Sequence, residues 1–107
     1  MTALRRAAVD GLHHASRLVT QFGWAPASPD GPSLHVMAHL RAAARCSAAR
    51  HHMRAEDVRA LMGYLLEASV DSGLWPWEDE PGRSAADVSH ALAVAAATAA
   101  SPTPDAL

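Results

Sequence analysis

The chain has 107 residues, which is enough for one domain with one modest core. Its formal net charge is −2, and its nine basic residues, all arginine, are interspersed with eleven acids. That balance argues against a nonspecific nucleic-acid binder, which needs a basic stripe to displace counterions. The single cysteine, Cys46, excludes an internal disulfide. No apolar run is long enough to span a bilayer. We therefore expect a cytoplasmic protein.

Apolar residues recur at spacings of three and four in four stretches, which predicts amphipathic helices, while no stretch predicts a strand. The expected helices cover residues 2–22, about 34–50, from about 55 to a stop at Gly73, and 85 to about 100. We predict an all-α fold, a small single-domain bundle of about four helices over residues 1–100. Residues 101–107 contain two prolines and no apolar pattern, which predicts a disordered tail.

The first expected helix has one apolar face that ends at Phe22, and Gly23 can take the left-handed conformation that closes a helix. Gly11 weakens this helix or lets a neighbouring element come close. His13 and His14 lie beside the apolar face, so we interpret them as solvent-facing. In the third helix the expected inner face is formed by five residues at helical spacing: Val58, Leu61, Met62, Leu65 and Ser69.

The second helix, with Ser33 as its expected N-cap, has two distinct sides. We expect one side to face the core, with Val36, Met37, Leu40, Ala44 and Ala48. His35, His39 and Cys46 share another, alanine-lined side, which could equally be a packing or dimer surface. His35 and His39 have the spacing at which two imidazoles share a metal ion, but two ligands do not close a zinc site. We expect no metal and no cofactor, with His35 and His39 as weak metal candidates.

The segment before the last helix is the most distinctive part of the chain. Trp75 and Trp77 flank Pro76 and would point the same way in an extended segment. Three acids follow, Glu78, Asp79 and Glu80, and then a Pro-Gly turn. Ser84 followed by Asp87 resembles a capping box that starts the last helix.

The order of these motifs resembles a family of small bacterial all-helical proteins known only as a domain of unknown function. The shared features are Phe22-Gly23-Trp24 after the first helix and the Trp-x-Asp-x-Pro-Gly-Arg-Ser segment of residues 77–84. The resemblance covers roughly residues 4–98. Trp77-Glu78-Asp79 stands where that family tends to have Trp-Asn-Asp, with one further residue before the proline. The resemblance implies a fold and a shared surface, but no activity.

Two functions are consistent with these residues. In the first, Trp24, Trp75, Trp77 and Arg83 form an anchor patch of a protein-interaction or regulatory module, since Trp and Arg dominate binding energy at interfaces. The partner would be another protein or a second copy, with no membrane and no nucleic acid. In the alternative, a small-molecule or metal-dependent enzyme uses His39 as a base with Glu78 or Asp79 as its partner acid. Equally, the acids could clamp Arg83 while the tryptophans seal the bundle.

Overall fold

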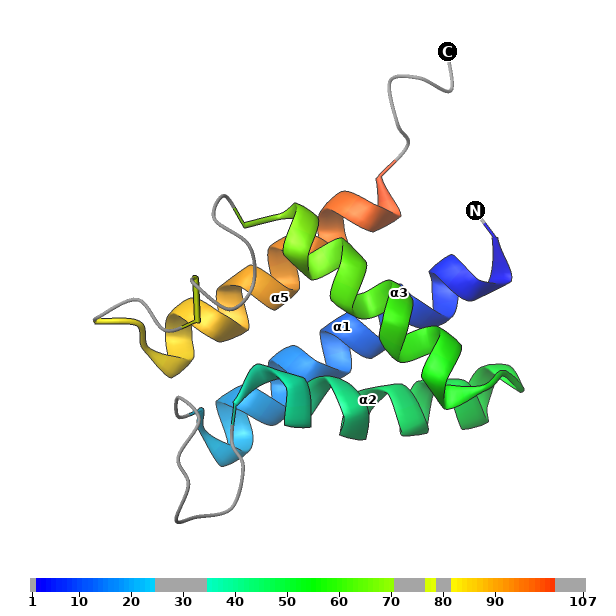
Figure 1. Cartoon of the computed structure of the whole chain (residues 1–107), viewed down its shortest axis with the longest axis horizontal. Coiled ribbons are helices and arrows are strands. Elements are labelled where there is room, and N and C mark those ends of the chain that lie inside the picture. The colour runs from blue at the N-terminus through cyan, green and yellow to red at the C-terminus, as the bar shows by residue number, and fades with distance from the viewer. Residues whose placement is uncertain (1, 25–34, 71–76, 79–81, 102–107) are drawn as a thin grey trace.

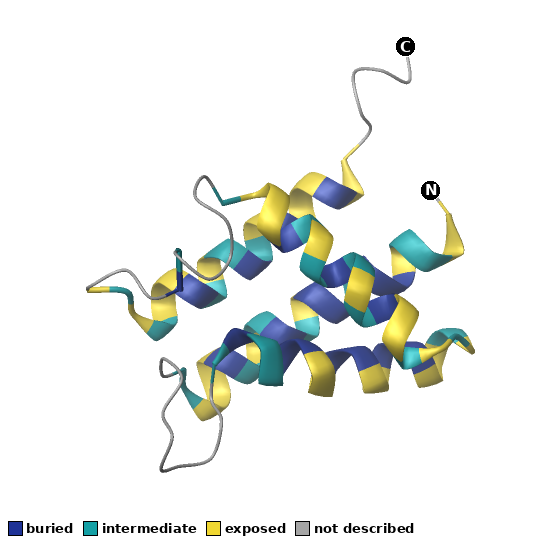
Figure 2. Ribbon diagram, in the orientation of Figure 1, coloured by how far each residue is buried: buried dark blue, intermediate teal, exposed yellow. Residues whose placement is uncertain are grey.

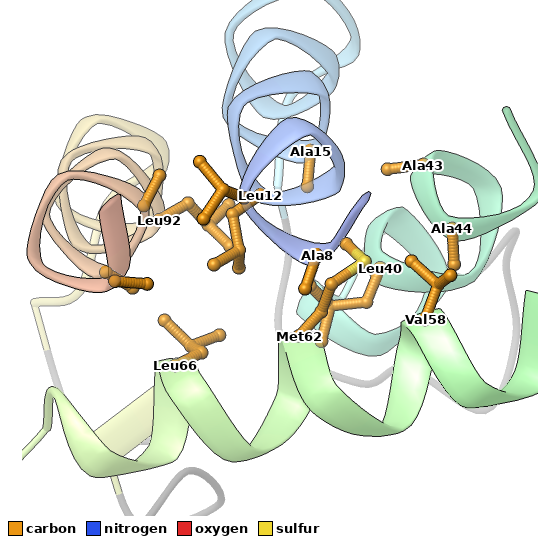
Figure 3. Packing of buried hydrophobic residues seen from close by; sticks show 14 of the residues in the cluster. Ala8, Leu12, Ala15, Leu40, Ala43, Ala44, Val58, Met62, Leu66 and Leu92 are labelled. Carbon is orange, nitrogen blue, oxygen red and sulfur yellow. The ribbon is translucent and has the colours of Figure 1, made fainter. Parts of the chain in front are cut away.

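Four α-helices account for most of the residues that the computed structural model describes, which are 2–24, 35–70, 77–78 and 82–101. They are α1 (Ala3–Phe22), α2 (Val36–His51), α3 (Ala55–Ala68) and α5 (Ala85–Ala100), and these residues include no strand. The helices α5, α1 and α2 lie side by side, and α3 crosses one face of this layer (Figures 1 and 3). The all-α bundle predicted from the sequence is confirmed. None of the described helices has the length and hydropathy needed to cross a membrane.

The central helix is α1, which contacts each of the other three helices. Its bounds match the prediction, because Thr2 caps its start by accepting a hydrogen bond from the Arg5 amide and Gly23 closes its end at a φ of 87°. Phe22, predicted to face the core, is instead 60% exposed. It is the last residue of α1, at the end of the bundle where α2 and α5 begin (Figure 1).

The crossing of α3 over α1 takes place at Gly11. A Cβ atom at Gly11 would lie 2.5 Å from the sulfur of Met62, which is fully buried. Of the two alternatives that the sequence left open for this glycine, the structure shows the close approach. Met62 belongs to the buried stripe of α3 together with Val58 and Leu66, whereas Ser69, predicted to face inward, is exposed. The helix ends at Ala68, one residue before it, and Gly73 lies outside the described residues.

Small side chains allow α1 and α2 to pack closely. Ala15 of α1 and Ala43 of α2 face one another (Figure 3), and Ser47, fully buried, donates a hydrogen bond of 2.6 Å to the carbonyl oxygen of Ala7. Because α2 packs against both α1 and α3, its buried face is broader than a single stripe and includes seven residues. These are Val36, His39, Leu40, Ala43, Ala44, Ser47 and Ala48. Figure 2 shows the buried positions of the helices turned toward one another.

The side of the second helix on which His35, His39 and Cys46 are predicted to lie is not uniform in its exposure to solvent. His39 lies at the edge of the buried face and is only 6% exposed, whereas Cys46 is exposed to solvent. His35 is not part of the helix: it is the N-cap of α2, and its Nδ1 accepts a hydrogen bond from the Met37 amide. The predicted cap, Ser33, lies outside the described residues.

The start of α5 agrees with its prediction. The Ser84 side chain accepts from the Asp87 amide, and the Asp87 carboxylate accepts from the Ser84 amide, which completes the capping box. At the other end of α5, Nε of Arg5 donates a 2.8 Å hydrogen bond to the Ala99 carbonyl. A positive side chain in that position satisfies a carbonyl of the last turn and favours the negative end of the helix.

Candidate functional site

The site predicted around the acidic loop is organised by one buried carboxylate, that of Glu78, which is only 2% exposed. Its Oε2 accepts two hydrogen bonds of 2.7 Å, one from the indole Nε1 of Trp24 and one from the backbone amide of Val36. Val36 is the first residue of α2, where a negative charge is favoured by the helix dipole. Glu78 therefore ties the end of α1 and the start of α2 to the segment that precedes α5.

His39 makes a second tie between the same elements. Its Nε2 lies 2.9 Å from the carbonyl oxygen of Gly23, the C-cap residue of α1. Because a carbonyl oxygen can only accept, Nε2 carries the proton and donates this hydrogen bond. The imidazole thus joins the first turn of α2 to the residue that closes α1.

Arg83 and Trp77 form the outer part of the site. The Arg83 guanidinium carbon lies 4.2 Å from the centroid of the Trp77 ring, within the range of a cation–π interaction. Nε of Arg83 also donates a 3.0 Å hydrogen bond to the backbone carbonyl of Trp77. Both side chains are half-buried, so the stacked pair keeps part of its surface in solvent.

Four large side chains belong to the chain segments that meet at this end of the bundle. Phe22 is the last residue of α1, Trp24 follows it by two residues, and Trp24 contacts Glu78, the neighbour of Trp77. We call Phe22, Trp24, Trp77 and Arg83 the aromatic end. Away from it, the described core consists of aliphatic side chains, mostly alanine, valine and leucine. The aromatic area is therefore concentrated where the helix ends meet.

The predicted binding residues Trp24, Trp77 and Arg83 come together at the aromatic end, whereas Trp75 and Asp79 lie outside the described residues. Glu80, the third acid of the expected clamp on Arg83, lies outside them as well. Sequence reasoning missed two features. It did not single out Phe22 as an exposed residue, and it did not separate Glu78 from its acidic neighbours as the buried acid. No local signal in the sequence separates Glu78 from Asp79 and Glu80, because its partners Trp24 and Val36 are distant along the chain.

The histidines of α2 do not extend into a metal centre. Within residues 2–24, 35–70, 77–78 and 82–101, no three His, Cys, Asp or Glu side chains are placed to hold one ion. Nδ1 of His35 accepts a hydrogen bond from the Met37 amide, and Nε2 of His39 donates one to the Gly23 carbonyl. In the described residues these two rings therefore have structural roles at the helix ends.

The catalytic candidates His39 and Glu78 are both nearly inaccessible. They are 6% and 2% exposed, and each contacts the helix ends through its hydrogen bonds. A general base must come within hydrogen-bond distance of the proton that it abstracts from a substrate. In the observed geometry both side chains connect helix ends through hydrogen bonds, and nothing in it supports a catalytic pair.

Comparisons of this chain with protein-family models, with curated proteins and with solved structures found no match.

Proposed function

We propose that this protein is a small protein-interaction module that binds its partner through the aromatic end. The observation that carries the proposal is the partial exposure of Phe22, Trp77 and Arg83 around a rigid, buried anchor. Phe22 is 60% exposed, although burial of a phenylalanine side chain is worth about 1.5–3 kcal/mol. That free energy becomes available when a partner covers the ring.

The side chains of the aromatic end are held in place by hydrogen bonds and stacking, which supports a role in binding. Glu78 joins three segments through Trp24 and Val36, and Arg83 is held over Trp77 by a hydrogen bond as well as by stacking. Side chains fixed in this way lose little conformational entropy when they bind. Tryptophan and arginine are also the residues enriched among those that dominate interface energies. The partner surface that fits is an apolar pocket that covers the rings of Phe22 and Trp77.

The proposed partner is another protein or a second copy of this chain, and the proposed location is the cytoplasm. The enzyme alternative has the weaker support, because its two described candidates, His39 and Glu78, are buried and hold helix ends together.

The test is a binding experiment with three variants whose folding is checked by circular dichroism. Phe22→Ala removes an exposed ring, so it should leave the fold intact while weakening partner binding at least tenfold. Trp77→Ala should act in the same direction. The matched control is Tyr64→Ala, which removes a ring that is 69% exposed on α3, away from the aromatic end. It should bind like the wild type.

The readout is capture of partners from native lysate, identified by mass spectrometry, together with sedimentation equilibrium of the purified chain. A partner retained by wild type and Tyr64→Ala but lost by folded Phe22→Ala supports the proposal. Concentration-dependent dimerisation that Phe22→Ala abolishes would identify a second copy as the partner. If wild type, Phe22→Ala and Trp77→Ala behave alike in both measurements, the aromatic end is not a binding surface.

A further inference from the structure

A second surface, which shares no residue with the aromatic end, is a hollow of about 250 Å³ between α2 and α3. Three arginines line it, Arg41 and Arg45 from α2 and Arg59 from α3. Ala44 and Ala55 line it between them, together with Glu56. Ala44 is 1% exposed and faces Val58 of α3 (Figure 3), so the base of the hollow is the packed junction of the two helices.

Among the described residues, few groups offset the positive charges in this hollow. Within the described part of the chain, neither Arg41 nor Arg45 has a side-chain hydrogen bond or an ion pair. Arg59 reaches across to α2, where its Nη1 lies 3.7 Å from the sulfur of Met37. The one acid in the lining, Glu56, is paired at 4.0 Å with Arg54, which lies outside the lining. Three guanidinium groups and one carboxylate leave a net charge of +2 on the hollow.

The like charges around this hollow repel one another only weakly when no ligand is bound, because Arg41 and Arg45 are exposed to solvent. Arg41 and Arg45 are four residues apart on α2, the spacing at which like charges destabilise a helix. Arg59 brings a third positive charge to the same hollow from α3. An anion that neutralises them removes this repulsion, and guanidinium groups bind the oxygens of phosphate through paired hydrogen bonds.

The first two residues of α3 also line this hollow. Ala55 and Glu56 are its first two residues, and within the described residues their backbone amides have no hydrogen-bond acceptor. The N-cap residue, Arg54, provides no side-chain cap. Free amides at a helix start favour a bound anion. They supplement the three arginines, which carry most of the positive charge.

We propose that the hollow lined by Arg41, Arg45 and Arg59 is a binding site for the phosphate group of a phosphate monoester. A monoester carries a charge of about −1.5 to −2 near neutral pH, which matches the net +2 of the hollow. A carboxylate would leave half of that charge unbalanced. The phosphate belongs either to a free small molecule or to a phosphorylated side chain of another protein. This proposal does not depend on the function of the aromatic end.

The test is a titration of the ¹⁵N-labelled full chain, followed by NMR at constant ionic strength. The probes are inorganic phosphate, ribose 5-phosphate and a phosphoserine peptide, with acetate and the unphosphorylated peptide as references. Saturable shifts are expected at the amides of Ala55 and Glu56 and at the Nε groups of Arg41, Arg45 and Arg59. Acetate should bind at least about tenfold more weakly than phosphate, because it carries one charge fewer.

Variants distinguish binding of phosphate in this hollow from nonspecific attraction of anions to the protein surface. Arg41→Gln and Arg45→Gln should each weaken phosphate binding about tenfold, the loss expected for one hydrogen bond to a charged group. Glu56→Gln should strengthen it several-fold by removing a negative charge. Arg17→Gln, which removes an exposed arginine of α1 outside the hollow, should have no effect. Circular dichroism confirms that each variant is folded.

The two sources of the phosphate are distinguished by the ester arms. Tighter binding of ribose 5-phosphate than of the phosphopeptide indicates a free small molecule, and the reverse order indicates a phosphorylated protein. Either order of affinities supports the site if Arg41→Gln weakens binding of the tighter ligand. The proposal is overturned if no probe gives saturable shifts, or if Arg17→Gln weakens binding as much as Arg41→Gln.

Discussion

The indole nitrogen of Trp24 donates a 2.7 Å hydrogen bond to the carboxylate of Glu78, 54 residues further along the chain. The same oxygen accepts the amide of Val36 at the start of α2. Through one buried atom, the structure thus connects the end of its first helix, the start of its second and the segment before its last. This connection sets the geometry of the aromatic end.

Removal of this carboxylate should destabilise the whole fold. In Glu78→Ala the indole of Trp24 and the amide of Val36 lose their acceptor, and each unsatisfied donor costs about 1–3 kcal/mol. We expect the free energy of unfolding to fall by about 2–4 kcal/mol in urea denaturation. Glu78→Gln should lose less, because its amide oxygen can still accept. The control is Glu67→Ala, an exposed acid of α3, which should change stability by less than about 0.5 kcal/mol. Equal stability of Glu78→Ala and Glu67→Ala would contradict this role.

Alanine substitutions of two helical glycines should have different effects. Gly63→Ala adds a methyl group to α3 where nothing lies within 4 Å, so it should gain about 0.5–1 kcal/mol of stability from helix propensity. Gly11→Ala gains the same propensity but places its Cβ 2.5 Å from the sulfur of Met62. Displacing this side chain in a packed core costs about 1–3 kcal/mol, so Gly11→Ala should be the less stable variant by at least about 1 kcal/mol. Thermal and urea unfolding of both variants measure the difference.

The capping box of α5 should make the free energy of unfolding depend on pH in the acidic range. Hydrogen bonds from the backbone and side chain of Ser84 lower the pKa of the Asp87 carboxyl below its ordinary value of 3.8, with smaller contributions from Arg83 and His90. A depressed pKa in the folded state adds stability above the unfolded pKa, and this stability is lost as the pH falls through the folded value. The stability difference between wild type and Asp87→Asn should therefore be present at pH 6 and disappear in strong acid. A difference that stays constant across this range would contradict the role of the charge.

His14 should titrate below the ordinary pKa of histidine. Burial, followed by the positive charges of Arg17 and Arg50, lowers its pKa from 6.5, and its Nδ1 is buried without a partner in the described residues. Because the unfolded chain takes up this proton more readily, the contribution is complete above pH 6.5 and is lost as the pH falls through the folded value. An NMR titration of the His14 ring should give a midpoint below 6.5 that rises in Arg50→Gln. A midpoint at or above 6.5 in wild type would show that the ring is solvated.

Local features of the fold could be predicted from the sequence because short-range physics determines them. Gly23 ends α1 as expected, since a glycine accepts the positive φ that this C-cap requires. Ser84 and Asp87 form the expected capping box because their partners lie only three residues apart. The apolar periodicity likewise identified Leu12 of α1, Met62 of α3 and Leu92 of α5 as inward-facing residues. All three are fully buried.

The positions of His39, Cys46 and Glu78 depend on contacts that a helical wheel does not contain. The second helix packs on two neighbours, so its buried face extends to His39 and leaves Cys46 in solvent. Three consecutive acids give no local signal for which one is buried. Glu78 is identified only when α1 and α2 bring Trp24 and Val36 to it, and these lie 54 and 42 residues away.

The hydrogen bond from Arg5 to the Ala99 carbonyl bears on how the protein can be tethered to a surface or to another domain. It brings the start of α1 beside the end of α5, while the aromatic end lies at the far end of α1, about 30 Å away at 1.5 Å per residue. A tether joined before α1 or after α5 therefore leaves from one end of the bundle, and Phe22 and Trp77 lie at the other end. Immobilised by either end, the protein presents its proposed contact surface outward, with the bundle itself as the spacer.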